Sequence, residues 1–240
     1  MSEVVILDTA ELLATAAAAR LITTLVDAQA AYGDASVVLT GGRVGGAVLR
    51  AVRTSPARDA VDWGRVDFWW GDERWLPAGD AERNDKQADD ALLSHVPVDP
   101  ARVHPFPAAS DDLSPQDAAA AYTAELAPDG MLPRIDVLML GVGEEGHVAS
   151  IFPDSPATRA TGFVEPVFNC PKPPSTRLTL TFPAITTATE VWLLAAGAAK
   201  ADAVAEALGG ATGIPAGAVY GTAHTRWLLD AEAASKIATS

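Results

Sequence analysis

Apolar runs of strand length alternate along this chain with longer, alanine-rich segments, and this alternation limits what the chain can fold into. We predict strands at 36–40, 66–70, 135–140, 189–195 and 226–229. We predict helices at 9–31, 46–54, 84–93, 116–126 and 198–208, and a further helix after Asp230. Because these strands are apolar on both faces, they should form a mostly parallel sheet covered by helices on both sides. The fold class expected is therefore α/β.

Composition narrows the function classes. The 240 residues are 49% hydrophobic and 20% charged, as in a soluble globular protein, and no linker separates domains, so we expect one domain over residues 1–240. The net charge of -14 argues against nucleic acid or an anionic membrane as the main partner. The single cysteine, Cys170, excludes an intrachain disulfide, and no zinc-ligand spacing occurs. Without a signal peptide pattern, a cytoplasmic location is expected.

A candidate acid/base follows the apolar run 135–140. Three closely spaced glycines, Gly141, Gly143 and Gly146, precede His147 and leave little side-chain bulk around its ring. A short helix predicted after His147 would bring its positive N-terminal end close, which favours a neutral imidazole able to accept a proton near pH 7. The alternative is a hydrogen-bonded structural histidine. In an open parallel sheet, however, ligands bind just beyond the carboxyl ends of the strands, which is where His147 lies.

A glycine-rich turn after the first predicted strand is a candidate anion site. Gly41 and Gly42 would let a phosphate approach the backbone, and Arg43 follows at the start of a helix. A cation there opposes the helix dipole unless an anion neutralises it. The pattern matches neither the dinucleotide fingerprint nor a P-loop. A plain turn with a solvated arginine is the alternative.

Three further places at strand ends carry charged side chains. Asp72, Glu73 and Arg74 follow a very apolar strand and form either a salt-bridged corner or a polar site. Arg177 alternates with leucines and threonines, which suits a sugar or phosphate but also an exposed edge strand. Lys200 repeats the arrangement of Arg43, a cation in the first turn of a predicted helix.

Nucleophilic catalysis finds no support in the sequence. No serine lies in a G-x-S-x-G motif, and Cys170 lies among prolines without a base beside it. A histidine, nearby carboxylates and several cations instead favour proton transfer on a phosphorylated small molecule.

These motifs together resemble the 6-phosphogluconolactonases of the oxidative pentose phosphate pathway. The resemblance covers nearly the whole chain and runs, in order, through residues 39–43, 71–74, 84–85, 140–153, 173–179, 197–200 and 227–230. It implies a fold similar to that of glucosamine-6-phosphate deaminase and ribose-5-phosphate isomerase. It also implies hydrolysis of 6-phospho-D-glucono-1,5-lactone to 6-phosphogluconate without a metal or organic cofactor.

The resemblance assigns roles to residues of this chain. His147 becomes the acid/base, and the cations Arg43, Arg74, Arg177 and Lys200 lie near the substrate. We accordingly expect a catalytic group of His147, Glu145 and Asp72, and a substrate- or phosphate-binding group of Gly41, Gly42, Arg43, Arg74, Arg177 and Lys200.

The chain departs from the family pattern at two positions. Glu145 stands where the family usually has aspartate, which leaves the contact made by the longer carboxylate open. Arg83 stands where serine is common, so no role is transferred to that position.

Two alternative functions differ in class from lactone hydrolysis. An amino-sugar-phosphate deaminase or isomerase of related fold would carry a glutamate five residues after the histidine, where this chain has Phe152, which cannot relay a proton. A sugar-phosphate-binding regulator would keep the pocket and lack the chemistry. The expected partner in each case is a small sugar phosphate, and the chain is expected to be a monomer or a small homo-oligomer.

Overall fold

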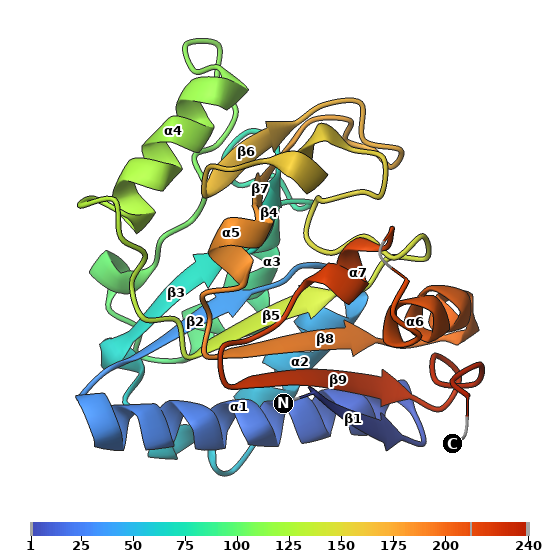
Figure 1. The fold of residues 1–240 in the computed structure, drawn as a ribbon. Helices are drawn as coiled ribbons and strands as arrows, with labels where there is room; N and C mark the ends of the chain where they lie inside the picture. The colour runs from blue at the N-terminus through green and yellow to red at the C-terminus, as the bar shows by residue number, and fades with distance from the viewer. Residues whose placement is uncertain (1, 212, 239–240) are drawn as a thin grey trace.

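A six-stranded, wholly parallel sheet forms the centre of the molecule (Figure 1). The structure, a computed structural model, describes residues 2–211 and 213–238. The strand order is β1-β9-β8-β5-β2-β3. The bounds are β1 Ser2–Leu7, β2 Ala35–Leu39, β3 Val66–Trp70, β5 Val137–Gly141, β8 Glu190–Ala195 and β9 His224–Asp230. The inner strands are buried on both faces, which explains their continuous apolar sequences.

Helices α1 (Ala10–Tyr32) and α2 (Gly42–Thr54) pack against each other on one side of this sheet. The hydroxyl of Thr9 caps α1 by accepting a hydrogen bond from the Leu12 N–H at 3.2 Å. Gly33 ends α1 with φ 88°, in the left-handed region that glycine adopts at low cost. The remaining α-helices are α3 Asn84–Ala91, α4 Pro115–Leu126, α5 Phe182–Ile185, α6 Ala201–Leu208 and α7 Pro215–Ala218. Short 3₁₀ turns lie at Arg58–Ala60, Trp63–Arg65, Leu93–His95, Pro100–Arg102, Pro156–Arg159 and Ala198–Lys200.

A second sheet of three antiparallel strands lies on the other side, together with α4 (Figure 1). Its order is β4-β7-β6, with β4 Asp72–Arg74, β7 Arg177–Leu180 and β6 Val164–Val167. Gly71 joins the two sheets: its N–H donates to the Leu39 carbonyl at 3.0 Å, and its carbonyl accepts from Leu180 at 2.8 Å. The parallel α/β sheet was predicted correctly, and this second sheet was not.

Several predicted elements differ in the structure. The helix expected after Asp230 is absent from the described residues, because 231–236 form turns in which Ser235 and Ile237 bond to carbonyls three residues earlier. The described residues 148–155 form no helix either; β-bridges link Val148 to Val142 and to Ile151. Helix α2 begins at Gly42 instead of residue 46, which brings the glycine-rich turn into its first turn.

Residues of both sheets and of α1 share one hydrophobic core cluster. The assignment of residues 1–240 to one domain stays a prediction, with this shared cluster in its favour. None of the described helices combines the length and the apolar character needed to cross a membrane.

Candidate active site

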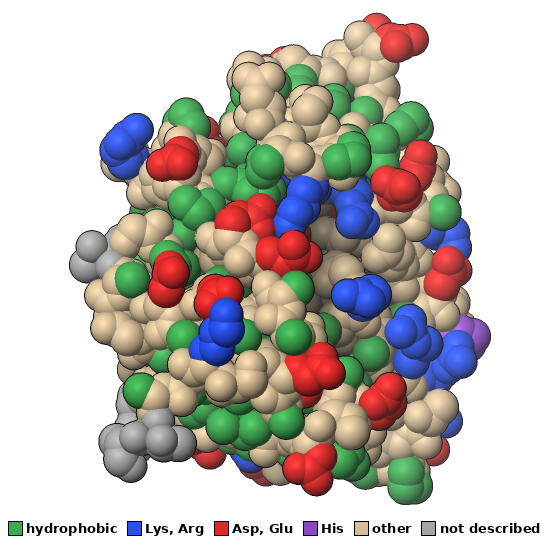
Figure 2. Space-filling model, turned by 90° about the vertical axis from the view of Figure 1, so that its right-hand side faces the viewer, with side chains coloured by type: hydrophobic (Ala, Val, Ile, Leu, Met, Phe, Trp, Pro, Cys, Tyr) green, Lys and Arg blue, Asp and Glu red, His purple; other side chains and the backbone are tan. Residues whose placement is uncertain are grey.

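A pocket of about 300 Å³ opens at the carboxyl ends of β2, β5 and β8. Figure 2 looks onto this edge of the molecule and shows Lys and Arg side chains around a hollow near the centre of the view. The second sheet supplies the opposite wall through β4 and β7. The predicted residues that line the pocket are Gly41, Gly42, Arg43, Asp72, Arg74, His147, Arg177 and Lys200.

His147 lies against the turn that follows β5. Its carbonyl accepts a hydrogen bond from the Gly143 N–H at 2.8 Å. A Cβ atom at Gly143 would lie 1.9 Å from Nδ1 of His147, so only glycine allows the ring this position. The expectation that glycine clears space around the histidine is confirmed at this residue.

Burial lowers the pKa of His147, and the charge of Lys172 lowers it further, whereas the charges of Glu145 and Asp72 raise it. The net direction is downward, so the ring is neutral at pH 7. The predicted direction is confirmed, but the predicted cause is wrong, because no helix begins beside the ring.

Glu145 lies beside His147 and is not among the residues that line the pocket. Its Oε1 is 3.3 Å from Nδ1 of His147, and its Oε2 accepts a hydrogen bond from Nζ of Lys172 at 3.0 Å. The approach to His147 lacks hydrogen-bond geometry, so Nδ1 is buried without a hydrogen-bond partner among the described residues. Glu145 therefore interacts with the His147 ring through its nearby charge and not through a hydrogen bond.

Asp72 forms part of the pocket wall and is almost fully buried. Its Oδ2 accepts a hydrogen bond from the Ser150 hydroxyl at 2.6 Å, and its Oδ1 accepts one from Nδ2 of Asn84 at 3.2 Å. Asn84 also donates to the Asp72 backbone carbonyl at 2.8 Å. Two neutral donors therefore fix the carboxylate, which forms no ion pair with any other residue that the structure describes.

Glu73 has a structural role one residue further along β4. Its carboxylate accepts the N–H groups of Asn84 and Asp85, at 2.7 and 2.9 Å, and so caps the start of α3. Burial raises the pKa of Glu73 to about 7, against these donors and the charge of Arg83, which lower it. In the charged segment 72–74, Glu73 is therefore buried in a structural corner, whereas Asp72 and Arg74 line the pocket.

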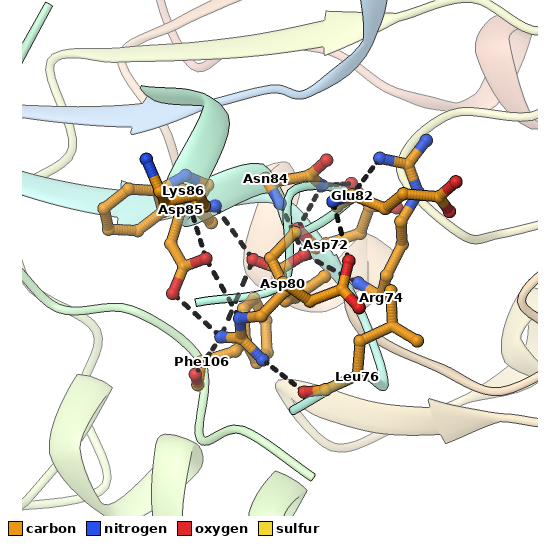
Figure 3. A network of polar contacts seen from close by, with 12 residues as sticks. Asp72, Arg74, Leu76, Asp80, Glu82, Asn84, Asp85, Lys86 and Phe106 are labelled. Carbon is orange, nitrogen blue, oxygen red and sulfur yellow. Dashed lines mark hydrogen bonds and ion pairs between the residues drawn. The ribbon is translucent and has the colours of Figure 1, made fainter. Parts of the chain in front are cut away.

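Arg83 is almost fully buried, at 1% exposure. Its Nε and Nη2 bind both carboxylate oxygens of Asp85 at 3.0 Å, and Nη2 also donates to the Phe106 carbonyl at 2.7 Å. Figure 3 shows how Asp85 and Phe106 lie in this network beside Asp72 and Asn84. Arg83 therefore fastens α3, whose first residue, Asn84, holds Asp72.

The glycine-rich turn brings backbone and cations to one rim of the pocket. A Cβ atom at Gly41 would lie 1.9 Å from Oδ1 of Asn84, so the turn can approach that side chain only as glycine. Gly42 has φ 78°, which also favours glycine. Arg43 lies in the first turn of α2, which contains no acidic residue. The anion site stays a prediction; Gly41, Gly42 and Arg43 all line the pocket at this rim.

Lys200 borders the pocket from the loop after β8. The carboxylate of Asp230 accepts the Gly197 N–H at 2.9 and 3.0 Å, which fixes that loop. Burial lowers the pKa of Lys200, as do the charges of Lys172 and Arg43, while Glu144 at 3.9 Å and Glu145 raise it. Lys200 therefore lies close to two other cations, Lys172 and Arg43, and to the carboxylates of Glu144 and Glu145.

Arg177 occupies the central strand of the small sheet, and the alternative of an exposed edge strand is wrong. Its Nε and Nη2 donate to the carbonyls of residues 172–174 at 3.2 to 3.4 Å. The neighbouring Thr179 is fully buried and accepts a hydrogen bond from the Ser150 N–H at 3.2 Å. Most of the donors of Arg177 therefore hold protein carbonyls.

The sequence analysis assigned no functional role to three polar residues of the site: Asn84, Ser150 and Lys172. Lys172 lies among prolines and carries no strand or helix pattern, although it is a lone cation five residues before Arg177. Among residues 2–211 and 213–238, no group of three His, Cys, Asp or Glu side chains is arranged to hold a metal ion.

Comparison with known proteins identifies the family. Residues 8–227 match the family described as glucosamine-6-phosphate isomerases/6-phosphogluconolactonase. A 6-phosphogluconolactonase from Streptomyces coelicolor is 57% identical, over 96% of this chain and 92% of its own length. One from Mycobacterium tuberculosis is 46% identical, over 98% of both chains. The structure of a Trypanosoma brucei 6-phosphogluconolactonase superposes with a TM-score of 0.85 at 25% identity, over 99% of both chains. The chain therefore belongs to the glucosamine-6-phosphate isomerase/6-phosphogluconolactonase family.

Proposed function

We propose that this chain hydrolyses 6-phospho-D-glucono-1,5-lactone to 6-phospho-D-gluconate, the second step of the oxidative pentose phosphate pathway. The observation that carries the proposal is a half-buried histidine of lowered pKa in one pocket with Arg43, Arg74 and Lys200. A neutral imidazole supplies the proton transfer that lactone opening needs, and the cations supply sites for a phosphate. Relatives of high identity along the whole chain carry the name of this activity.

His147 acts on water in the proposed reaction. A proton on Nδ1 is attracted by the carboxylate of Glu145, which leaves Nε2 free to accept a proton from the attacking water. The water oxygen forms a bond to C1, and the bond between C1 and the ring oxygen breaks. His147 then returns the proton to the departing ring oxygen, so no covalent intermediate with the protein forms.

The carboxylate of Asp72 and the cations divide the remaining tasks. Asp72 stabilises the imidazolium that forms when His147 takes the proton, because its charge raises the pKa of that ring. A cation or backbone N–H beside C1 stabilises the oxyanion, a contribution of about 3–4 kcal/mol in a well-aligned site. Phosphate binding by Arg43, Arg74 or Lys200 would hold the sugar in register. Gly41 and Gly42 allow the backbone to come close to that group.

The deaminase alternative lacks its proton-transfer group. Phe152 lies with its ring centroid 4.5 Å from that of His147, so an aromatic side chain packs where a carboxylate would be needed. If the protein binds 6-phosphogluconate but does not hydrolyse the lactone, the result will favour the alternative of a sugar-phosphate-binding regulator. The cytoplasmic location and the monomeric or small oligomeric state stay predictions.

A rate measurement on two lactones tests the proposal. Protein treated with a chelator should accelerate opening of 6-phosphogluconolactone above its spontaneous rate and leave unphosphorylated gluconolactone nearly untouched. The His147→Gln variant serves as the control for buffer and background hydrolysis. Equal rates on both lactones, or loss of activity on chelation, would contradict the proposal.

A further inference from the structure

Lys172 is a pocket cation to which the proposed reaction assigns no task. Its Nζ lies 3.0 Å from Oε2 of Glu145, while Oε1 of the same carboxylate lies 3.3 Å from Nδ1 of His147. Glu145 is therefore held between a lysine on one side and the histidine on the other. The adjacent Glu144 faces a different cation, Lys200, at 3.9 Å. Each of these consecutive carboxylates thus has its own cation.

The backbone that carries Lys172 is fastened from the small sheet. Lys172 lies in the connection 168–176 between β6 and β7, and the carbonyls of residues 172–174 accept hydrogen bonds from Arg177. The same connection is closed by a hydrogen bond of 2.9 Å from the Cys170 N–H to the Ser175 carbonyl. The backbone position of Lys172 is consequently set by hydrogen bonds within this connection and from β7, and Nζ reaches Glu145 from there.

Few charged groups face the ring of His147. Glu145 belongs to its own turn, Asp72 approaches from β4, and Lys172 approaches from the connection before β7. The Phe152 ring packs against the His147 ring, and Cζ of Arg177 lies over the Phe152 ring, 5.8 Å from its centroid. Since Glu145 makes no aligned hydrogen bond with His147, its carboxylate is held by the hydrogen bond from Lys172 and by a backbone N–H of its own turn.

We propose that Lys172 is a positioning residue that holds Glu145 against His147, and that Arg177 acts through the loop that presents Lys172. The proposal builds on the proposed function, in which His147 transfers the proton. It gives the cation set two separate tasks: Lys172 and Arg177 arrange the acid/base, and Arg43, Arg74 and Lys200 remain for the substrate.

Titration of the His147 ring by NMR tests this coupling without any need for activity. The His147 signals are assigned by their loss in His147→Gln. In the parent protein, Glu145→Gln should lower the ring pKa by about one unit, because a carboxylate that favours imidazolium is removed. In a Lys172→Met background the same exchange should shift the pKa much less, because the carboxylate is no longer held in place.

Two variants frame the result. Lys172→Arg keeps a cation within reach of Glu145 and should retain most of the shift. Lys236→Met removes a lysine that pairs with Asp202 at 2.6 Å on the surface, and should leave the shift at its parent size. Equal shifts with and without Lys172 would overturn the proposal, because Lys172 would then be only a distant charge.

Kinetics give a second readout. Lys172→Met should lower kcat by the same factor as Glu145→Gln, and the double variant should lose little more. A rise in KM with kcat unchanged would make Lys172 a substrate ligand and would also overturn the proposal. If the NMR coupling is present and lactonase activity is absent, the proposed function fails and the positioning role of Lys172 stands.

Discussion

The Ser150 hydroxyl donates a hydrogen bond of 2.6 Å to Oδ2 of Asp72, and it does so from a fully buried position. Ser150 lies three residues after His147, so one short turn holds both the acid/base and the donor that fixes the opposing carboxylate. Asp72, in turn, belongs to the small sheet. This hydrogen bond therefore connects the two walls of the pocket.

Ser150→Ala should destabilise the protein and disturb the site together. A lost hydrogen bond to a buried charged group costs about 1.5–3 kcal/mol, which denaturant unfolding can measure. Ser94→Ala removes an exposed hydroxyl that bonds to the Asp89 carbonyl, and should change the free energy of unfolding little. Equal effects of the two substitutions would show that the bond to Asp72 contributes nothing special.

His147→Gln should lower kcat by roughly 10²–10⁴, the usual contribution of a positioned acid/base. Affinity for 6-phosphogluconate should stay close to the parent value, because the substitution leaves the cations of the pocket in place. Steady-state rates and product-binding calorimetry measure the two effects. A variant that keeps most of its turnover would make His147 a structural residue.

Lys200→Ala and Arg43→Ala should each weaken productive binding of the phosphorylated lactone. Loss of one charge-assisted contact costs about 1.5–3 kcal/mol, or some tenfold to a hundredfold in kcat/KM. The residual rate on unphosphorylated gluconolactone should be the same in the variants and the parent, because that substrate offers no phosphate. An equal loss of kcat/KM on both lactones would mean that these residues stabilise the oxyanion or the fold and do not bind the phosphate.

Gly143→Ala should abolish most activity while the fold survives. The new Cβ atom would lie 1.9 Å from Nδ1 of His147, so the ring must leave its position. Gly213→Ala is the matched control, because nothing lies within 4 Å of a Cβ atom there and its backbone is not left-handed. Circular dichroism and kcat together separate the two effects. Full activity in Gly143→Ala would show that the observed ring position is not required.

His104 should make stability depend on pH. Burial lowers its pKa, but hydrogen bonds to Asp67 and Glu125 and their charges outweigh burial, so the net shift is upward. A raised folded-state pKa means stabilisation that is complete below the unfolded value of about 6.5 and is lost as pH rises through the folded value.

The His104→Phe variant provides the measurement. Phenylalanine keeps the stacking on Trp69, whose ring centroid lies 3.9 Å away, and removes the titrating group. The stability gap between parent and variant should be largest near pH 6 and shrink toward pH 9. A gap that does not change with pH would contradict the ionic role of His104.

The parallel sheet could be predicted from sequence because its strands are buried on both faces and therefore read as continuous apolar runs. In the small sheet, the strand predicted at 176–181 from its period-two alternation is confirmed as β7, whereas β4 and β6 were not predicted. β4 is three charged residues long, and the carboxylate of its first residue, Asp72, is held by Asn84 and Ser150, which lie 12 and 78 residues further along the chain. β1 at the sheet edge leaves Val4 and Ile6 exposed, which weakens its pattern.

The candidate site was predictable where a residue follows a strand, as His147, Arg43 and Lys200 do. Lys172 was not, because its place depends on hydrogen bonds from Arg177 to a loop without periodic pattern. The lowered pKa of His147 was expected from a helix that does not form; burial produces it instead. Local sequence therefore indicates the candidates, and long-range contacts decide their environment.

The connection between the two sheets at Gly71 determines how the protein should lose activity in denaturant. It joins β3 to β4, and the pocket takes His147 and Lys200 from the large sheet but Asp72 and Arg177 from the small one. The small sheet has strands of three or four residues, and its edge strand β6 is half-buried, whereas β5 and β8 have five and six residues and lie at the centre of the large sheet. Segments with fewer buried contacts open at lower free energy. In mild denaturant, turnover should therefore cease while hydrogen exchange still protects the amides of β5 and β8, so inactivation would precede global unfolding.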